Sequence, residues 1–250
     1  MTKLKNKVAL ITGGTSGIGK ATAIDFIENG ASVIITGRFQ NTIDETIKEL
    51  GEKAKGIVSD AGKMADLLQL GEKIKLISPQ IDILYVNAGF GKYAPIELID
   101  ETHFDEQFNV IVKGTLFTVQ QILPLMKEGG AIILNTSIVT EIGMQNSSVY
   151  SAAKAAVQSF VKTFASELAS KKIRINAVSP GPIATNYFDR SNLTAEQIQS
   201  FAGAVFPQIP LARFGQPSEV AKAITFLASE DASFMHGTEI FVDGGFPKIK

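Results

Sequence analysis

The chain has 250 residues, a formal net charge of -1, no cysteine and 45% hydrophobic residues. The near-neutral charge and the lack of a long basic block argue against nucleic acid or an acidic membrane surface as a partner. The lack of cysteine excludes disulfides, thiolate nucleophiles and cysteine-based metal sites. The apolar content is enough for one large α/β core, so we predict a single domain over residues 1–250.

Short apolar runs rich in β-branched residues predict strands at 7–12, 32–36, 55–58, 82–87, 131–136, 173–179 and 239–243. Helical patterns lie between them, at 17–29, 41–50, 63–77, 101–127, 149–170 and 217–229. Near-continuous apolar strands that alternate with helices are typical of a parallel sheet covered on both faces. The sequence therefore predicts an α/β fold, a single-domain doubly wound (Rossmann) parallel sheet of about seven strands with helices on both faces.

The apolar run VALI near the amino terminus is far shorter than the core of a signal peptide and leads directly into glycines. No other run approaches the roughly 20 apolar residues that cross a bilayer. We therefore expect a cytoplasmic location and no membrane partner. The expected partners are a small-molecule substrate and further copies of the chain.

One long irregular stretch, residues 180–215, separates the sixth predicted strand from the last predicted helix. Connections of this length inside a compact domain are usually functional or disordered. Thr194 and Gln197 have the spacing of a capping box, which predicts the start of a short helix. The apolar residues that follow indicate a substrate lid at about 186–212, or else a surface excursion that docks on its own core. These apolar residues are Phe201, Val205, Phe206 and Ile209.

The segment TGGTSGIG, residues 12–19, follows the first predicted strand and opens the first predicted helix. Glycines at 13, 17 and 19 allow the backbone to approach a pyrophosphate, and the helix N-terminus offers it unpaired N–H groups. A glycine cluster alone can be a mere tight turn, and this spacing is not the commoner Gly-x-Gly-x-x-Gly. The preceding strand and the following helix favour phosphate binding.

Tyr150 and Lys154 begin and end the segment YSAAK, so they share one face of a predicted helix. A free tyrosine has a pKa of about 10 and is a poor base at neutral pH. A nearby ammonium stabilises the phenolate and lowers its pKa, as an opposite charge commonly does by about one to three units in other pairs. The two residues therefore form either an acid/base couple or an ordinary amphipathic pair, which is the commoner meaning of this spacing.

Two further polar residues, Ser137 and Asn109, are candidates for the catalytic site. Ser137 lies at the end of a predicted strand, where a doubly wound fold places its ligand crevice. Its hydroxyl can donate to an oxygen that gains negative charge, although a serine there can also be a turn residue. Asn109 lies inside a predicted helix, where asparagine is unfavourable, so it is either functional or a buried hydrogen-bond filler.

Five motifs together resemble the short-chain dehydrogenase/reductase family in order and spacing over essentially the whole chain. They are Thr12-Gly13-x-x-x-Gly17-x-Gly19, Asn87-Ala88-Gly89, Ser137, Tyr150-x-x-x-Lys154 and Pro180-Gly181.

The resemblance implies a catalytic set of Asn109, Ser137, Tyr150 and Lys154. In this set Tyr150 exchanges a proton with the substrate oxygen, and Ser137 donates to the same oxygen. Lys154 shifts the pKa of the tyrosine and holds the nicotinamide ribose. Asn109 positions a water that connects Lys154 to solvent.

The resemblance also implies which residues hold the cofactor. Asp60 matches an acidic residue beside the adenine, Asn87 and Gly89 flank the adenine ribose, and Ile183 and Thr185 match contacts to the carboxamide. The full set of implied contacts is Gly13, Thr15, Ser16, Gly17, Ile18, Gly19, Arg38, Asp60, Asn87, Gly89, Tyr150, Lys154, Pro180, Gly181, Ile183 and Thr185.

The end of the second predicted strand, VIITGRF, bears on the choice of cofactor. NAD-specific sites usually carry an acidic side chain here for the ribose 2′-hydroxyl, and this position is Gly37. Arg38 follows and can bind a 2′-phosphate, although it can also be a solvated loop charge. Ser16, where many NADP-preferring relatives carry a basic residue, weakens the case. We predict that NADP(H) is favoured, with NAD(H) as the alternative.

The predicted function is an NAD(P)(H)-dependent carbonyl reductase or alcohol dehydrogenase, acting on a ketone, an aldehyde or a secondary alcohol. Family resemblance implies a homotetramer. An alternative is a 3-oxoacyl-carrier-protein reductase, which Lys171 and Lys172 favour and Glu128 disfavours, because an acidic partner requires basic residues at the entrance. A non-catalytic cofactor-binding scaffold or sensor is the alternative from another class, against which the catalytic set stands.

The two histidines carry no recognisable site. His103 and His236 lie in the polar contexts ETHFDE and FMHGTE, so we predict that both are surface residues. No Ser-His-Asp arrangement and no metal-ligand spacing is present in the sequence, which argues against a hydrolase and against a metal site.

Overall fold

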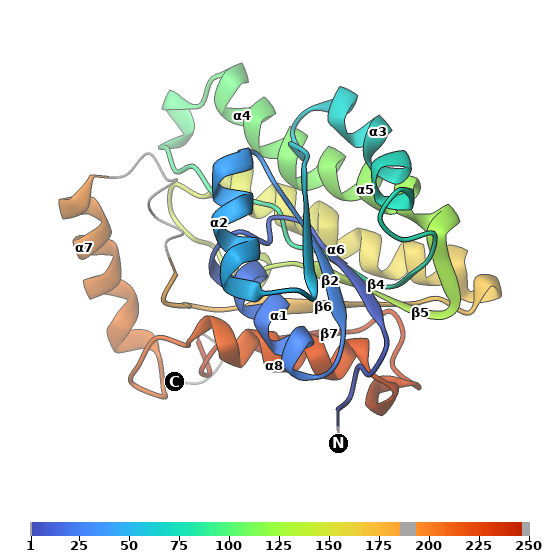
Figure 1. The fold of residues 1–250 in the computed structure, drawn as a ribbon. Helices are drawn as coiled ribbons and strands as arrows, with labels where there is room; N and C mark the ends of the chain where they lie inside the picture. The colour runs from blue at the N-terminus through green and yellow to red at the C-terminus, as the bar shows by residue number, and fades with distance from the viewer. Residues whose placement is uncertain (1, 186–193, 247–250) are drawn as a thin grey trace.

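The computed structural model describes residues 2–185 and 194–246. These residues form a seven-stranded parallel sheet in the order β3-β2-β1-β4-β5-β6-β7 (Figure 1). The predicted parallel sheet is confirmed, and each predicted strand is present. The strands are β1 Val8–Ile11, β2 Ser32–Gly37, β3 Ala54–Val58, β4 Ile81–Val86, β5 Met126–Asn135, β6 Arg174–Pro180 and β7 Glu239–Val242.

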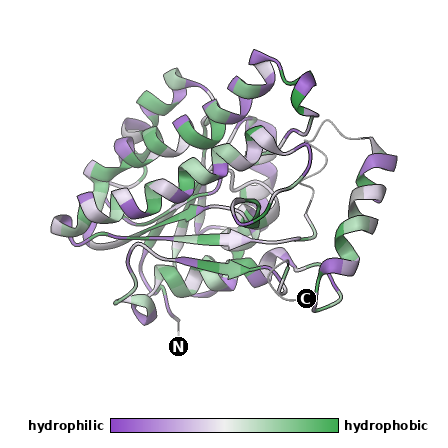
Figure 2. Ribbon diagram, turned by 180° about the vertical axis from the view of Figure 1, so that it is seen from behind, coloured by the Kyte–Doolittle hydropathy of each residue, from purple (hydrophilic) through white to green (hydrophobic). Residues whose placement is uncertain are grey.

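Helices cover both faces of the sheet, as predicted. Buried side chains of α3, α5 and α6 pack into one apolar cluster with strand residues, and those of α1 and α8 pack into a second cluster. Figure 2 shows the hydrophobic residues concentrated along the strands between these layers. The helices are α1 Gly17–Glu28, α2 Gln40–Leu50, α3 Met64–Lys75, α4 Glu101–Phe108, α5 Gly114–Ile122, α6 Ser148–Leu168, α7 Ala195–Val205 and α8 Pro217–Ala228.

Strands β2 and β3 lie on one side of β1, and strands β4 to β7 lie on the other. Ala9 of β1 pairs with Val33 of β2 on one side and with Ile83 of β4 on the other. The chain therefore adds its first three strands outward on one side of β1, and then returns to add β4 and the later strands on the other side. The strand order reverses between β1 and β4. In open parallel sheets, ligands bind in the crevice at the carboxyl ends of the strands beside such a reversal.

The predicted helix over 101–127 is wrong in its extent. It is divided into α4, a π-helical turn over Asn109–Lys113 and α5, and it ends in a 3-10 turn over Leu123–Leu125. Pro124 in that turn lacks the N–H that a continuing helix needs. Met126 then pairs with Ile81 of β4, so strand pairing replaces the helical pattern at the end of this segment.

The region of the predicted lid is described only from Thr194 onward; residues 186–193 lie outside the described residues. The predicted capping box is confirmed, because the Thr194 side chain and the Gln197 side chain bond each other's backbone at the start of α7. Figure 1 shows α7 standing apart from the main body. Its last residue, Val205, is buried with Ile209, Ile138 and Phe246, which anchors the end of α7 on the core.

Short 3-10 helices complete the described structure, and no described helix is long and apolar enough to cross a membrane. Besides Leu123–Leu125, they occupy Ile96–Leu98, Ile138–Thr140, Ala169–Lys171, Phe206–Gln208 and Glu230–Ala232.

Candidate active site

The glycine-rich turn between β1 and α1 is so tight at Gly19 that it has no space for a side chain there. A Cβ atom at Gly19 would lie 2.4 Å from the carbonyl oxygen of Gly13. Gly13 and Gly17 adopt φ values of 65° and 54°, which suit glycine. The first turn of α1 carries no acidic residue, so its positive end meets no carboxylate of its own helix. The turn therefore fits the phosphates of a dinucleotide.

Hydrogen bonds tie this turn to the end of β4. The Thr12 hydroxyl oxygen accepts from the backbone N–H of Asn87 at 3.0 Å and of Ala88 at 3.1 Å. The side-chain amide of Asn87 donates to the carbonyls of Thr12 and Gly13, both at 3.1 Å. The glycine-rich turn and the Asn87–Gly89 segment, which lie far apart in the sequence, therefore form one wall of the crevice.

The Tyr150 and Lys154 side chains project from the first turns of α6 and are almost completely enclosed. They are 7% and 4% exposed, and the Lys154 Nζ lies 5.9 Å from the centroid of the Tyr150 ring. That Nζ donates to the carbonyl oxygen of Asn135 at 2.7 Å, at the carboxyl end of β5. Burial lowers the pKa of Lys154 from its usual 10.5 to about 8. Lys154 therefore remains largely protonated at neutral pH, at a cost in desolvation.

Ser137 follows β5 two residues after Asn135 and is 8% exposed. It caps the 3-10 turn Ile138–Thr140, and its hydroxyl oxygen accepts from the backbone N–H of Val139 at 3.4 Å. An accepted bond of this kind leaves the hydroxyl proton available for another acceptor. The 3-10 turn that Ser137 caps packs against α6, the helix that carries Tyr150 and Lys154.

Asn109 begins the π-helical turn that interrupts the predicted helix. Turns of this type are rare and occur frequently at functional sites. The Asn109 side-chain oxygen accepts from the Lys113 ammonium, one π turn later. A Cβ atom at Gly89 would lie 3.7 Å from Ile111 of this turn and 3.7 Å from the Lys154 Nζ. Gly89 is therefore the point where the π turn and Lys154 approach each other.

The segment after β6 forms the opposite wall. Gly181 donates to the carbonyl of Val242 at 3.0 Å, which continues the pairing with β7. Ile183 forms a parallel bridge with Gly215, so the segment is also held by the chain that enters α8. A Cβ atom at Gly17 would lie 3.7 Å from the Thr185 side chain. This contact brings the predicted carboxamide-binding segment, which begins at Pro180, against the glycine-rich turn.

The ends of β2 and β3 carry the predicted adenosine contacts. A Cβ atom at Gly37 would lie 2.8 Å from the Thr15 side chain, so an acidic residue here would require neighbouring side chains to shift. Arg38 is exposed, and its guanidinium lies 5.4 Å from the centroid of the Phe39 ring. Asp60 is partly buried after β3, and its carboxylate accepts from the backbone N–H of Gly62 at 3.0 Å.

The histidines lie apart from this crevice. His103 is partly exposed on α4. His236 is exposed, but its Nδ1 accepts from the N–H of Ile175 at 3.1 Å and its Nε2 lies 2.8 Å from the carbonyl of Ala165. It thus joins β6 to α6, a structural role that the sequence did not indicate. Among the described residues no group of three or more His, Asp or Glu side chains could hold a metal ion.

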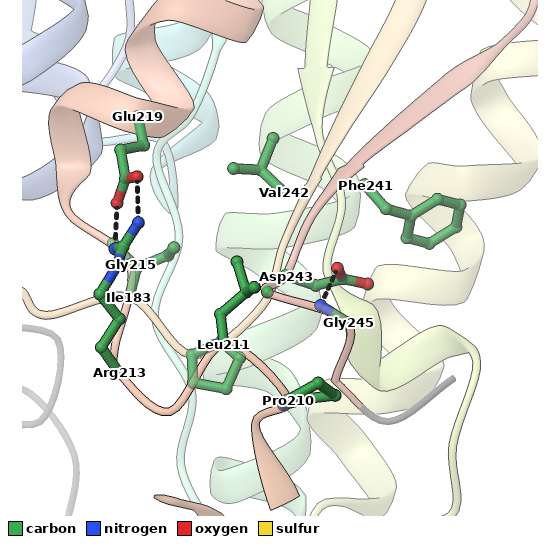
Figure 3. Close-up of a pocket in the computed structure, with 12 residues that line it drawn as sticks. Ile183, Pro210, Leu211, Arg213, Gly215, Glu219, Phe241, Val242, Asp243 and Gly245 are labelled. Carbon is green, nitrogen blue, oxygen red and sulfur yellow. Dashed lines mark hydrogen bonds and ion pairs between the residues drawn. The ribbon is translucent and has the colours of Figure 1, made fainter. Parts of the chain in front are cut away.

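A separate cavity of about 380 Å³ lies beside the segment that leads into α8 (Figure 3). Its lining includes Pro182, Ile183 and Leu211, but none of the predicted catalytic residues. At its edge Arg213 binds the Glu219 carboxylate with two hydrogen bonds of 2.7 Å, and this pairing lowers the pKa of Glu219 to about 2. The pair fastens the segment just before α8 to the first turn of that helix.

Sequence reasoning missed one residue of the site. The backbone carbonyl of Asn135 accepts a hydrogen bond from the Lys154 ammonium, and the Asn135 side chain lies in a polar contact with Tyr85. A backbone acceptor carries no sequence signature, because every residue type provides a carbonyl. Only the packing of α6 beside the end of β5 in the structure reveals this contact.

The fold and the crevice define a dinucleotide-binding α/β protein with a buried tyrosine–lysine pair beside the nucleotide turn. A family model described as enoyl-(acyl carrier protein) reductase matches residues 13–247. The chain belongs to the short-chain dehydrogenase/reductase family of oxidoreductases.

Relatives align along nearly their whole lengths. The oxidoreductase asL5 of Sarocladium schorii is 41% identical, with 99% of this chain and 98% of the relative covered. The 3-oxoacyl-[acyl-carrier-protein] reductase FabG of Thermotoga maritima is 36% identical, with coverages of 97% and 98%. A solved structure of a blue fluorescent protein from a metagenomic library, in complex with NADPH, is 28% identical with a TM-score of 0.88, and the match covers 98% of this chain and 99% of that one.

Proposed function

We propose that the protein is an NAD(P)(H)-dependent carbonyl reductase or alcohol dehydrogenase that acts on ketones, aldehydes or secondary alcohols. The observation that carries the proposal is the enclosure of Tyr150 and Lys154, 7% and 4% exposed, beside a turn that fits a pyrophosphate. Nicotinamide, when bound, supplies or accepts the hydride. The residues of the chain then have to hold the nucleotide, orient the substrate oxygen and move one proton.

Tyr150 is the proposed proton donor for reduction and proton acceptor for oxidation. The Lys154 ammonium stabilises the phenolate electrostatically, because both groups lie in a region that largely excludes water. Ser137 donates a hydrogen bond to the substrate oxygen and stabilises its developing charge. Asn109, at the π-helical turn, is proposed to position the water through which Lys154 exchanges protons with solvent.

Turnover of the nucleotide tests this function directly. We expect loss of the reduced nucleotide's absorbance when the protein is mixed with NADPH or NADH and a suitable member of a panel of ketones, aldehydes and β-ketoacyl thioesters. Failure of every carbonyl in the panel, with nucleotide binding intact, would favour the cofactor-binding scaffold or sensor. Reduction of thioesters alone would favour the 3-oxoacyl-carrier-protein reductase.

The charged residues that the sequence analysis weighed for and against a carrier-protein substrate lie away from the proposed active site. Lys172 precedes β6 and pairs with Glu128 at 2.6 Å, at the amino ends of β5 and β6. Strands of this length span roughly 20 Å, and the catalytic groups lie at the carboxyl ends. The 3-oxoacyl-carrier-protein reductase alternative is therefore neither favoured nor disfavoured by the charges of Lys171, Lys172 and Glu128. The similarity to the Thermotoga maritima reductase keeps this alternative open.

NADP(H) is the proposed cofactor, with NAD(H) as the alternative. Gly37 carries no carboxylate that would repel a 2′-phosphate, and Arg38 is exposed beside it. Loss of a charged hydrogen bond costs about 1.5–3 kcal/mol. We therefore expect Arg38→Ala to weaken NADPH binding about ten- to a hundredfold and to leave NADH binding almost unchanged, as measured by fluorescence titration.

Arg38→Lys is the control, since it keeps the charge and loses the planar fork. It should retain part of the preference for NADPH. Equal affinities of the unaltered protein for the two nucleotides, or equal effects of Arg38→Ala on both, would place the phosphate elsewhere and favour NAD(H).

The segment at about 186–212 is the proposed substrate lid of a single domain, and its two central apolar residues should behave differently. Phe206 is 44% exposed with its ring 5.9 Å from the Phe214 ring, whereas Val205 is buried against Ile138, the neighbour of Ser137. We expect Phe206→Ala to change the ranking of ketones by kcat/KM while cofactor affinity stays constant. Val205→Ala should lower turnover of all ketones, because it loosens the docking of the lid.

Leu76→Ala provides the control for both lid variants, because Leu76 is 90% exposed at the end of α3. It should change neither the ranking nor the turnover. A uniform loss across all substrates in Phe206→Ala would contradict its role in substrate selection and would indicate a folding defect instead.

The proposed assembly is a homotetramer in the cytoplasm, an expectation that comes from the family and from the sequence. With a formal net charge of -1, neither nucleic acid nor a membrane is a proposed partner.

A further inference from the structure

A tyrosine hydroxyl is enclosed at the centre of the sheet. Tyr85 of β4 is 0% exposed, and its ring packs in the apolar cluster with Ile11, Ile83 and Ile133. A phenylalanine would fill this space without bringing a polar atom into the core, so the partners of the hydroxyl need explanation. Burial raises the pKa of Tyr85 well above its usual value, so the phenol stays neutral and remains a hydrogen-bond donor.

The partners are two asparagine side chains at the carboxyl ends of adjacent strands. The Tyr85 hydroxyl lies 3.1 Å from the side-chain oxygen of Asn135 and 3.3 Å from that of Asn87. One hydroxyl proton is therefore directed at two carbonyl oxygens, and both amide groups are oriented with their oxygens toward the core.

Each asparagine continues into a different part of the site. Asn87 donates through its amide nitrogen to the carbonyls of Thr12 and Gly13, at the start of the nucleotide turn. The backbone carbonyl of Asn135 accepts a hydrogen bond from the Lys154 ammonium. Tyr85 thus stands at the junction between the groups proposed to hold the phosphates and the group proposed to hold the nicotinamide ribose.

We propose that Tyr85 is a positioning residue for cofactor binding: its hydroxyl holds Asn87 and Asn135 in the orientations that fix the glycine-rich turn and Lys154. This inference rests on the proposed function, because it assumes that the turn and Lys154 hold a dinucleotide. It assigns Tyr85 no contact with substrate or cofactor. A purely structural hydroxyl would instead contribute to folding stability and leave nucleotide affinity unchanged.

Tyr85→Phe removes the hydroxyl and keeps the ring. We expect the Kd for NADPH and for NADH, measured by fluorescence titration of the intact protein, to rise about three- to tenfold, the size of one lost neutral hydrogen bond. Both nucleotides should be affected alike, because the affected groups hold parts common to both. Turnover at saturating nucleotide should also fall, since Lys154 loses part of its support.

Thr225→Val is the matched control. Thr225 is 3% exposed on α8, and its hydroxyl bonds the Asp25 carboxylate on α1, away from the crevice. This variant should lower the melting temperature to a similar extent and leave both Kd values unchanged. Unchanged Kd values in Tyr85→Phe would overturn the inference and leave the hydroxyl a purely structural role.

A second variant covers the case in which Tyr85→Phe does not fold. Asn135→Ala keeps the backbone carbonyl that binds Lys154 and removes the partner of the tyrosine at a position that is only partly buried. It should weaken both nucleotides as Tyr85→Phe does, and an unchanged Kd would contradict the inference. If the unaltered protein bound neither nucleotide, the proposed function itself would fail, and the two failures are therefore distinguishable.

Discussion

Tyr150→Phe should lower kcat by about 10²–10⁴-fold while cofactor binding is retained. The variant keeps the ring, which is 7% exposed and packs in the core cluster, so it removes the proton donor and preserves the shape of the site. Stopped-flow or steady-state oxidation of the reduced nucleotide gives the change in kcat, and fluorescence titration gives the Kd.

A neighbouring tyrosine provides the comparison. The Tyr93 ring lies 6.2 Å from the Tyr150 ring, so Tyr93→Phe removes a second hydroxyl close to the first. This control should retain turnover of the same order as the unaltered protein. Near-normal kcat in Tyr150→Phe, or an equal loss in Tyr93→Phe, would show that the proton comes from another group.

Lys154→Met should abolish turnover and weaken cofactor binding, because it removes both the cation that favours the phenolate and the donor proposed for the ribose. Methionine keeps most of the side-chain volume, so the core stays filled. The two effects are measured separately, as kcat at saturating nucleotide and as the Kd for the reduced nucleotide. Unchanged affinity for the nucleotide would contradict the second role of Lys154.

Lys154→Met should not lower folding stability at neutral pH, although it abolishes turnover. The pKa of Lys154 is about 8 in the folded protein and 10.5 ordinarily, so the charged form is the one that burial penalises. Below pH 8 the folded protein carries this penalty in full; between pH 8 and 10.5 the unfolded chain binds more protons, and stability rises with pH.

At neutral pH, Lys154→Met removes that penalty and also the 2.7 Å hydrogen bond to Asn135. The variant should therefore be as stable as the unaltered protein, or up to about 2 kcal/mol more stable. Its advantage should shrink as the pH rises from 7 to 10 in denaturant titrations. A variant that is less stable at neutral pH, with no dependence of the difference on pH, would show that the buried ammonium carries no such cost.

The sequence by itself determined the layers of the fold. Strands such as Val8–Ile11 are apolar at every buried position, and this pattern belongs to parallel sheets whatever the neighbouring strands are. Local chemistry also determined the start of α7, because a capping box needs only Thr194 and Gln197. The division of the helix after 101 was not visible, because its end depends on the pairing of Met126 with Ile81, a distant strand.

The motifs of the site were equally local. The spacing of Tyr150 and Lys154 places both side chains on one helix face, and the glycines of the nucleotide turn occur in one short segment. What surrounds them was decided only by the tertiary structure: the Asn135 carbonyl that holds Lys154, the Tyr85 hydroxyl between two strands, and the distance of Lys172 from the crevice. The physical reason is that these contacts join residues whose proximity depends on strand order and register, which short-range periodicity does not encode.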